Sequence, residues 1–116
     1  KQQLPKIKSF TDIIAWKEGH KLVLMVYQKT KQFPKDEIFG LTSQMRRCAV
    51  SITSNIAEGF SRQSQKEKVQ FYCISLGSLT ELQNQALIAR DIGFWARSAL
   101  YRALPGFTLP FLNRVV

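Results

Sequence analysis

Histidine and cysteine are scarce in this 116-residue sequence, which has only His20, Cys48 and Cys73. The two cysteines form no Cys-x-x-Cys pair, so the sequence offers neither a disulfide framework nor a cysteine-based metal site. No co-ligand is spaced suitably from His20, which we interpret as a core or interface residue. A carboxylate pair, a phosphate-binding loop and an activated nucleophile are also absent. We therefore expect a protein that is not an enzyme and uses no cofactor.

Long apolar runs are absent as well. No stretch approaches the roughly 20 uncharged apolar residues of a membrane span, and the basic N-terminal residues precede no apolar segment of the signal-peptide type. These features predict a cytoplasmic protein with no membrane partner. Four prolines in a chain that is 45% hydrophobic fit a helical protein, and the length fits one domain over residues 1–116.

Acidic residues are few, with eight against 17 lysines and arginines, which gives a formal net charge of +9. The excess lies at the two ends, because residues 1–35 contain eight lysines and residues 92–116 contain three unopposed arginines. Concentrated positive charge attracts polyanions and releases their counterions, so nucleic acid is the leading class of partner. Charge that serves only solubility is the alternative.

Residues 39–61 predict one long helix with two regular rows of side chains, with Gly40 at its entry and Gly59 at its end. The apolar row has the spacing of a helix face that packs on its neighbours. It consists of Leu41, Met45, Cys48, Ala49, Ile52 and Ile56. The adjoining polar row suits a polar network or a subunit interface, although an ordinary solvated face is the alternative. This row consists of Gln44, Arg47, Ser51, Asn55 and Glu58.

An earlier helix is predicted from Thr11 or Asp12 to about Gln32, because Pro34 disfavours helical conformation in Phe33. Its polar side is a row of lysines that is either a phosphate-binding surface or simple solvation of the helix. Its predicted core side consists of Ala15, Trp16, Leu22, Val23, Val26 and Tyr27, with His20 on the same arc.

A third helix is predicted from the Ser64-x-x-Glu67 capping-box spacing to about Ile92, with Gly93 as its stop. Gly77 and Ser78 in its middle predict close approach of another helix, because glycine costs up to about 1 kcal/mol in a helix interior. The apolar residues of this helix are Phe71, Tyr72, Leu76, Leu79, Leu82, Ala86 and Ala89. A second polar row beside them consists of Glu67, Ser78, Glu81 and Gln85.

The two ends of the chain differ from this pattern. Residues 1–9 are polar and basic, and we interpret them as an irregular arm. Residues 95–104 could form a short helix, but Pro105-Gly106 would end it and Pro110 prevents a quick restart. Residues 95–116 are therefore an atypical C-terminal segment.

The sequence of the long helix predicted over residues 39–61 resembles the signature of the bacterial four-helix-bundle family named for the 23S rRNA intervening-sequence protein. The resemblance covers about residues 8–94, and Thr53 departs from it because many relatives carry a helix-kinking proline there. The resemblance rests mainly on Phe39-Gly40-Leu41-Thr42-Ser43-Gln44, Arg46-Arg47 and Ser51-Ile52-x-x-Asn55-Ile56-Ala57-Glu58-Gly59. Supporting matches are Phe10, Trp16, Phe33-Pro34, Gly77-Ser78, Glu81-Leu82 and Gln85.

This resemblance implies an all-α, antiparallel up-and-down four-helix bundle whose fourth helix is short or irregular in this chain. It also implies a homo-oligomer, with a pentamer favoured, that associates with structured RNA or DNA. Together with the charge, it predicts phosphate contacts from Lys17, Lys21, Lys29, Lys31, Arg46 and Arg62. The predicted bundle or subunit network consists of Gln44, Arg47, Ser51, Asn55, Glu58, Ser78, Glu81 and Gln85. The alternative is a protein-binding assembly scaffold, such as an accessory protein of a reverse transcriptase.

Overall fold

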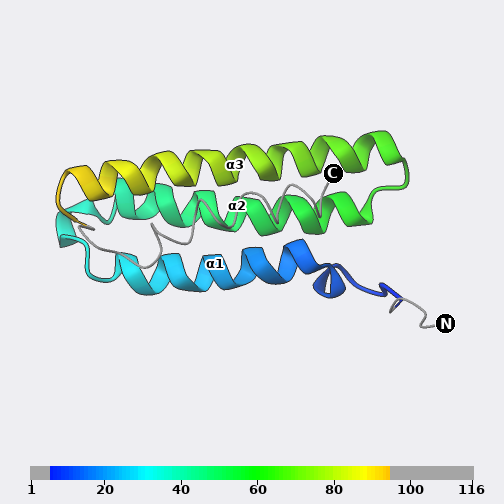
Figure 1. Ribbon diagram of the computed structural model, residues 1–116, viewed down its shortest axis with the longest axis horizontal. Helices are drawn as coiled ribbons and strands as arrows, with labels where there is room; N and C mark the ends of the chain where they lie inside the picture. The colour runs from blue at the N-terminus through cyan, green and yellow to red at the C-terminus, as the bar shows by residue number, and fades with distance from the viewer. Residues whose placement is uncertain (1–5, 95–116) are drawn as a thin grey trace.

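Three α-helices make up most of the computed structural model, which describes residues 6–94 (Figure 1). They are α1 (Ile14–Thr30), α2 (Leu41–Ser61) and α3 (Gln65–Asp91), and the single-turn 3-10 helices η1 (Phe10–Asp12) and η2 (Lys35–Glu37) precede α1 and α2. No strand occurs within the described range, so the predicted all-α class is confirmed. The predicted C-terminal segment 95–116 and the first five residues of the predicted arm lie outside the described residues.

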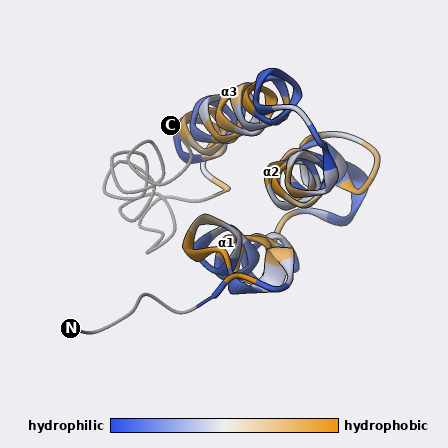
Figure 2. Cartoon of the chain, turned by 90° about the vertical axis from the view of Figure 1, so that its right-hand side faces the viewer, coloured by the Kyte–Doolittle hydropathy of each residue, from blue (hydrophilic) through white to orange (hydrophobic). Residues whose placement is uncertain are grey.

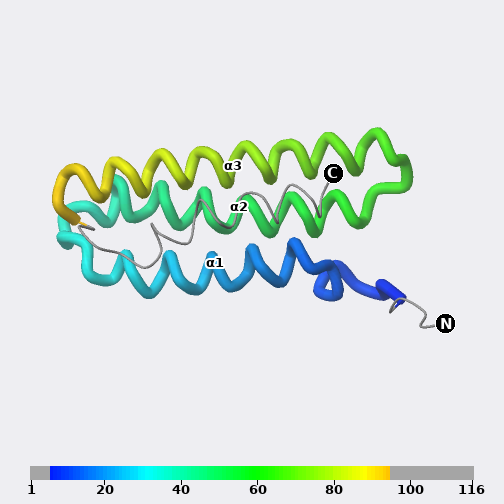
Figure 3. The backbone as a smooth tube through the Cα atoms, viewed as in Figure 1, coloured from blue at the N-terminus to red at the C-terminus, as the bar shows by residue number. Residues whose placement is uncertain are grey.

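Helix α2 lies between the other two helices, and successive helices run in opposite directions (Figures 1 and 3). Seen along their axes, α1 and α3 both flank α2 (Figure 2). Among the described elements, α2 contacts both neighbours, whereas the backbones of α1 and α3 do not approach each other. The motif that dominates the sequence is therefore also the centre of this helical arrangement. Within residues 6–94, no helix combines the length and apolarity needed to cross a bilayer.

The buried core follows the predicted apolar rows of α2 and α3. Met45, Ala49, Ile52 and Ile56 of α2 are fully buried, and Cys48 is 5% exposed. On α3, the fully buried apolar residues are Leu79, Leu82, Ala86 and Ala89. Because α2 packs on two helices, its apolar row is buried from Met45 to Ile56, whereas Leu41 at its start is only partly buried.

Helix α1 buries a narrower face than its apolar pattern predicts. Ala15, Leu22 and Val26 are buried, but Tyr27 is 40% exposed and His20 is also exposed. The prediction that Tyr27 faces the core is therefore wrong for the chain as described. The core alternative for His20 is also wrong, whereas an interface role for His20 remains a prediction. The buried direction passes through Gly19, which contributes no apolar side chain to the pattern, so the face pointing at α2 is rotated away from His20.

The start of α1 is later than predicted because a separate capped turn precedes it. Ser9 caps η1 through a capping box with Asp12, and extended Ile13 separates η1 from α1. The Asp12 carboxylate accepts hydrogen bonds from the backbone N–H groups of Lys8 and Ser9, at 3.0 and 3.1 Å. These bonds lower the pKa of Asp12 below its usual value. The end of α1 before Phe33-Pro34 agrees with the prediction.

Gly59 does not end α2, contrary to the prediction, because α2 continues to Ser61. A Cβ at Gly59 would lie 2.7 Å from Tyr72 Cε1 and 3.0 Å from Phe71 Cβ, so glycine is required for close packing of α3. The end of α2 is instead stabilised by Lys68, whose Nζ donates to the carbonyl oxygen of Phe60 at 2.8 Å. A lysine from the next helix thus satisfies an orphan carbonyl group.

Both predicted boundaries of α3 are confirmed. The Ser64 hydroxyl accepts a hydrogen bond from the Glu67 backbone N–H at 3.1 Å. At the other end, Gly93 has a φ of 89°, and the Phe94 N–H donates to the Ala89 carbonyl oxygen at 2.9 Å. This bond and the left-handed glycine form a Schellman motif.

The predicted close approach of another helix is confirmed at Ser78, whose Oγ lies 2.8 Å from Ser51 Oγ of α2, but not at Gly77. Gly19 is a contact point that was not predicted. A Cβ at Gly19 would lie 2.9 Å from Thr53 Cγ2, where α1 crosses α2. Helix α2 remains helical through Thr53, whose hydroxyl donates to the Val50 carbonyl oxygen. A Cβ at Gly77 would meet no atom of residues 6–94 within 4 Å.

Substitution of Gly77 by alanine is expected to stabilise the protein by about 0.5 to 1 kcal/mol. Alanine has the higher helix propensity, and open space surrounds this mid-helix position. Urea denaturation followed by circular dichroism measures the change. The same substitution at Gly19 is the matched comparison and should show no such gain, since its Cβ would press on Thr53. A lower stability of Gly77→Ala would contradict the prediction and indicate that another chain covers this position.

Candidate nucleic-acid interface and polar groove

The lysines of α1 form the most clearly available part of the predicted nucleic-acid interface. Lys17 and Lys21 are exposed and lie one helical turn, about 6 Å, apart on the outward side of α1. Lys31 is exposed at the C-cap of this helix, and Lys29 in its last turn is half-buried. None of these four ammonium groups forms an ion pair with another residue of the described range. Four cations along one helix are thus available to an anionic partner.

Arg46 lies near the C-terminal end of α1, but its guanidinium already contacts the protein. Its Nε–H donates to Thr30 Oγ1 at 2.9 Å, and its Cζ lies 4.7 Å from the centre of the Tyr27 ring. Thr30 in turn donates to the Val26 carbonyl oxygen at 2.7 Å. These contacts join α1 to α2, so Arg46 has a structural contact that the sequence did not predict.

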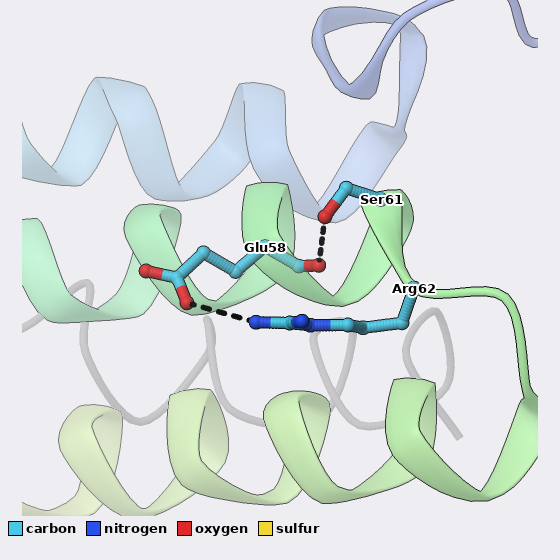
Figure 4. A network of polar contacts seen from close by, with 3 residues as sticks. All are labelled: Glu58, Ser61 and Arg62. Atoms are coloured by element: carbon cyan, nitrogen blue, oxygen red, sulfur yellow. Dashed lines mark hydrogen bonds and ion pairs between the residues drawn. The ribbon is translucent and has the colours of Figure 1, made fainter.

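Arg62 lies just beyond the end of α2 and is also engaged within the chain (Figure 4). One of its guanidinium nitrogens is 3.9 Å from Glu58 Oε2, and its Cζ lies 4.7 Å from the centre of the Phe71 ring. Both charged side chains remain largely exposed, so this ion pair contributes little to stability. Beside it, the Ser61 hydroxyl donates to the Glu58 carbonyl oxygen at 2.7 Å (Figure 4). Arg62 is therefore distant along the chain from the lysines of α1 and partly neutralised.

The two predicted polar rows meet where α2 packs on α3. Ser51 Oγ and Ser78 Oγ are 2.8 Å apart, and Asn55 Nδ2 donates to Ser51 Oγ at 3.0 Å and to the Ser51 carbonyl oxygen at 2.8 Å. The Cys48 thiol donates to the Ser78 carbonyl oxygen at 2.9 Å and lies 3.5 Å from Glu81 Oε2. Five polar side chains therefore form one continuous hydrogen-bonded chain across two helices.

A polar groove of about 280 Å³ lies over this chain of hydrogen bonds. It is lined by Gln44, Arg47, Cys48, Ser51, Ser78, Glu81 and Gln85. The side chains of Gln44 and Arg47 make no hydrogen bond or ion pair with other residues of the described range. Gln85 is only 5% exposed, and its Oε1 finds no hydrogen-bond donor there. A buried carbonyl oxygen without a donor costs about 1 to 3 kcal/mol, so this groove suits an occupant that supplies a donor.

Asn55 and Glu58 are the two members of the predicted network that do not line this groove. Glu58 pairs with Arg62 near the end of α2, whereas Asn55 reaches the groove through Ser51. The roles predicted for these residues in a subunit interface remain predictions, because they depend on a second chain.

A second hollow of about 480 Å³ lies between α2 and the end of α1. It is lined by Tyr27, Ile38, Ser43, Arg46, Arg47, Val50, Ser51 and Ser54. Arg47 and Ser51 line both this hollow and the polar groove. Ile38 and Val50 are 45% and 37% exposed, and neighbouring Phe39 is 94% exposed. The outward face of α2, together with the segment just before it, thus combines the unpaired Arg47 side chain with exposed apolar side chains.

Sequence reasoning missed several contacts because they join residues on different elements. The Ser75 hydroxyl donates to the Ile52 carbonyl oxygen at 2.7 Å and is fully buried between α2 and α3. Thr30 and Lys68 are further examples. Other contacts had a sequence signal, because Trp16 and His20, and likewise Glu58 and Arg62, are four residues apart along the chain.

Cys73 is expected to react with iodoacetamide at pH 8 while Cys48 in the folded protein stays unmodified. Burial and the negative charge of Glu81 raise the pKa of the Cys48 thiol to about 12, so almost no reactive thiolate exists at pH 8. Cys73 is exposed. Peptide mass spectrometry after labelling, with and without urea, measures both sites. Rapid modification of Cys48 without denaturant would contradict the described packing.

Comparison with known protein families supports the resemblance that the residues of α2 indicate. No curated protein matches the chain. The sequence model of one family, described as 23S rRNA-intervening sequence protein, matches residues 11–104, which is most of the chain. This range includes α1, α2 and α3 together with their predicted polar rows. The chain therefore belongs to the 23S rRNA-intervening sequence protein family.

Proposed function

We propose that this protein is a non-enzymatic, basic helical protein that associates with RNA or another nucleic acid as a homo-oligomer. The observation that supports this proposal is the set of unpaired cations Lys17, Lys21, Lys29 and Lys31 along α1. Such cations bind phosphate groups and release counterions, without any need to read bases. The family name, which refers to a sequence within ribosomal RNA, agrees with an RNA partner.

Oligomerisation would strengthen weak phosphate contacts, because several copies of α1 would act on one nucleic acid together. We propose that a pentamer forms and that the outward face of α2 supplies part of the subunit contact. This contact surface is supported by the unpaired Arg47, the buried Gln85 Oε1 and the exposed Phe39. A second copy of the chain offers both hydrogen-bond donors and apolar surface to these groups. We also propose that a short or irregular fourth helix within residues 95–116 completes a four-helix bundle, since the backbones of α1 and α3 approach α2 but not each other.

Binding of a structured RNA hairpin at 50 and 200 mM salt, with light scattering on the same samples, tests this proposal. For each phosphate contact, the slope of log affinity against log salt changes by roughly 0.7 to 0.9. We expect an oligomer whose affinity falls steeply with salt. An oligomer that retains no RNA even at 50 mM salt would refute the nucleic-acid function, and a monomer would refute the assembly.

The second candidate is an assembly scaffold for another protein, such as a reverse transcriptase. The hollow lined by Tyr27, Ile38 and Val50 favours this function, because it exposes apolar side chains beside Arg46 and Arg47. Protein binding that persists at high salt, together with no retention of RNA, would support this candidate over the first.

A further inference from the structure

Three rings lie in contact at the N-terminal end of α1. The ring of Phe10 meets that of Trp16 at an angle of 71°, with centroids 5.5 Å apart. The rings of Trp16 and His20 are nearly parallel, at 11°, with centroids 4.8 Å apart. The Ser9 capping box of η1 fixes the turn that carries Phe10. Local structure therefore holds the rings in place before any partner binds.

One face of the His20 ring is covered by Trp16, yet His20 is exposed to solvent. Its exposed area therefore lies outside the face that Trp16 covers. Trp16 is half-buried and packs against the core, so it anchors the stack to the helix bundle. The result is a supported aromatic ring with a free surface.

Charged groups around this stack are mainly positive. Lys17 precedes His20 by three residues and therefore lies on a neighbouring part of the helix surface, and Lys21 lies one turn beyond Lys17. Lys8 lies in the segment before η1. Two carboxylates lie nearby. Asp12 accepts hydrogen bonds from the backbone N–H groups of Lys8 and Ser9 and interacts electrostatically with Lys17. Glu18 is half-buried on α1, three residues before Lys21. An aromatic face beside cations is the arrangement with which proteins bind single-stranded nucleic acids.

We propose that the Trp16 and His20 stack is a binding site for an unpaired nucleobase. The base stacks on the free face of His20, while Lys17 and Lys21 contact the flanking phosphates. This inference rests on the proposed nucleic-acid function and narrows it to RNA or DNA with unpaired nucleotides. Stacking tolerates every base, so the site selects single strands over duplexes without selecting a sequence.

The test uses the full chain with Trp95→Phe, so that Trp16 is its remaining tryptophan. Two probes carry equal charge: a 12-nucleotide oligoadenylate and the same ribose-phosphate chain without bases. We expect oligoadenylate to quench Trp16 fluorescence and to bind roughly 10-fold more tightly than the abasic chain. His20→Ala should abolish this preference while leaving affinity for the abasic chain unchanged, and His20→Phe should retain it. Gln28→Ala, at another exposed position of α1, is the control and should behave as the parent protein.

Three other results would each contradict the stacking site in a different way. If both probes bind equally, or if His20→Ala keeps the preference, the stacking site is refuted while the electrostatic function stands. If neither probe binds at low salt, the nucleic-acid function and the stacking site both fail. If Trp16 fluorescence changes with protein concentration alone and oligoadenylate has no effect, the ring stack is a contact between protein chains, which also overturns the proposal.

Discussion

Replacement of Lys17, Lys21, Lys29 and Lys31 by glutamate is expected to weaken RNA binding on the order of 100-fold at 50 mM salt. These residues are the cations of α1 that have no ion-pair partner in the described structure. Each exchange changes the charge by two units, so the formal net charge falls from +9 to +1. Because phosphate contacts supply nearly all of the affinity in non-specific binding, repulsion then replaces most of the attraction. The salt dependence should also become shallower, by about three to four in slope.

The location of the charge can be separated from its amount with single variants. Lys21→Glu and Lys66→Glu make the same change in net charge, but Lys66 is exposed near the start of α3 instead of on α1. We expect Lys21→Glu to weaken RNA binding several-fold more than Lys66→Glu, as measured by fluorescence anisotropy with a labelled hairpin. Circular dichroism should show unchanged helix content in both single variants, because the side chains of Lys21 and Lys66 are exposed. Equal effects at the two positions would show that net charge, and not the lysines of α1, controls binding.

The cores of α2 and α3 could be predicted because their apolar side chains occupy one narrow arc. Helix α1 was harder to predict, since apolar or aromatic residues cover much of its circumference. Leu24, which is 58% exposed, and Tyr27 belong to that wide apolar surface but not to the core. Gly19 marks the true contact with α2 and leaves no trace in a hydrophobic pattern. The close approach of the α1 and α2 backbones at Gly19 therefore determines which face of α1 is buried. The spacing of apolar residues along α1 carries no information about that approach.

Local capping rules succeeded where all the participating atoms come from neighbouring residues. Ser64 with Glu67, and Gly93 with Phe94, are of this kind. Gly59 misled the prediction because a glycine near the end of a helix has two uses, termination and close packing. Tyr72 from α3 determines which use applies, and that residue is distant in the sequence.

The predicted polar rows could be assigned to single helices, but the register between them could not. The contact of Ser51 with Ser78 depends on how far α3 slides along α2, and the spacing within either helix carries no such information. The same limit explains why the contact of Arg46 with Thr30 was unforeseen. Separation of Glu58 from the groove likewise follows from tertiary packing, because Glu58 belongs to the same helical row as Ser51.

Substitution of Ile52 by alanine is expected to lower the free energy of unfolding by about 3 kcal/mol. Ile52 is fully buried in α2 between both neighbouring helices. Its Cγ2 lies 3.4 Å from the position of a Cβ on Gly19 of α1, and its carbonyl oxygen accepts the hydrogen bond of Ser75 from α3. Truncation removes apolar burial and leaves a cavity that neither helix can fill, since backbone contacts already fix their separation.

Val50→Ala is the matched comparison, because Val50 is a β-branched residue of the same helix that is 37% exposed. We expect a loss below about 1 kcal/mol there, since less apolar area is removed and alanine favours the helix. Urea denaturation must be followed at one fixed protein concentration, because assembly would add to the apparent stability. A larger loss for Val50→Ala than for Ile52→Ala, growing with protein concentration, would mean that the outward face of α2 contributes more to stability through a second chain than its inner face does within one.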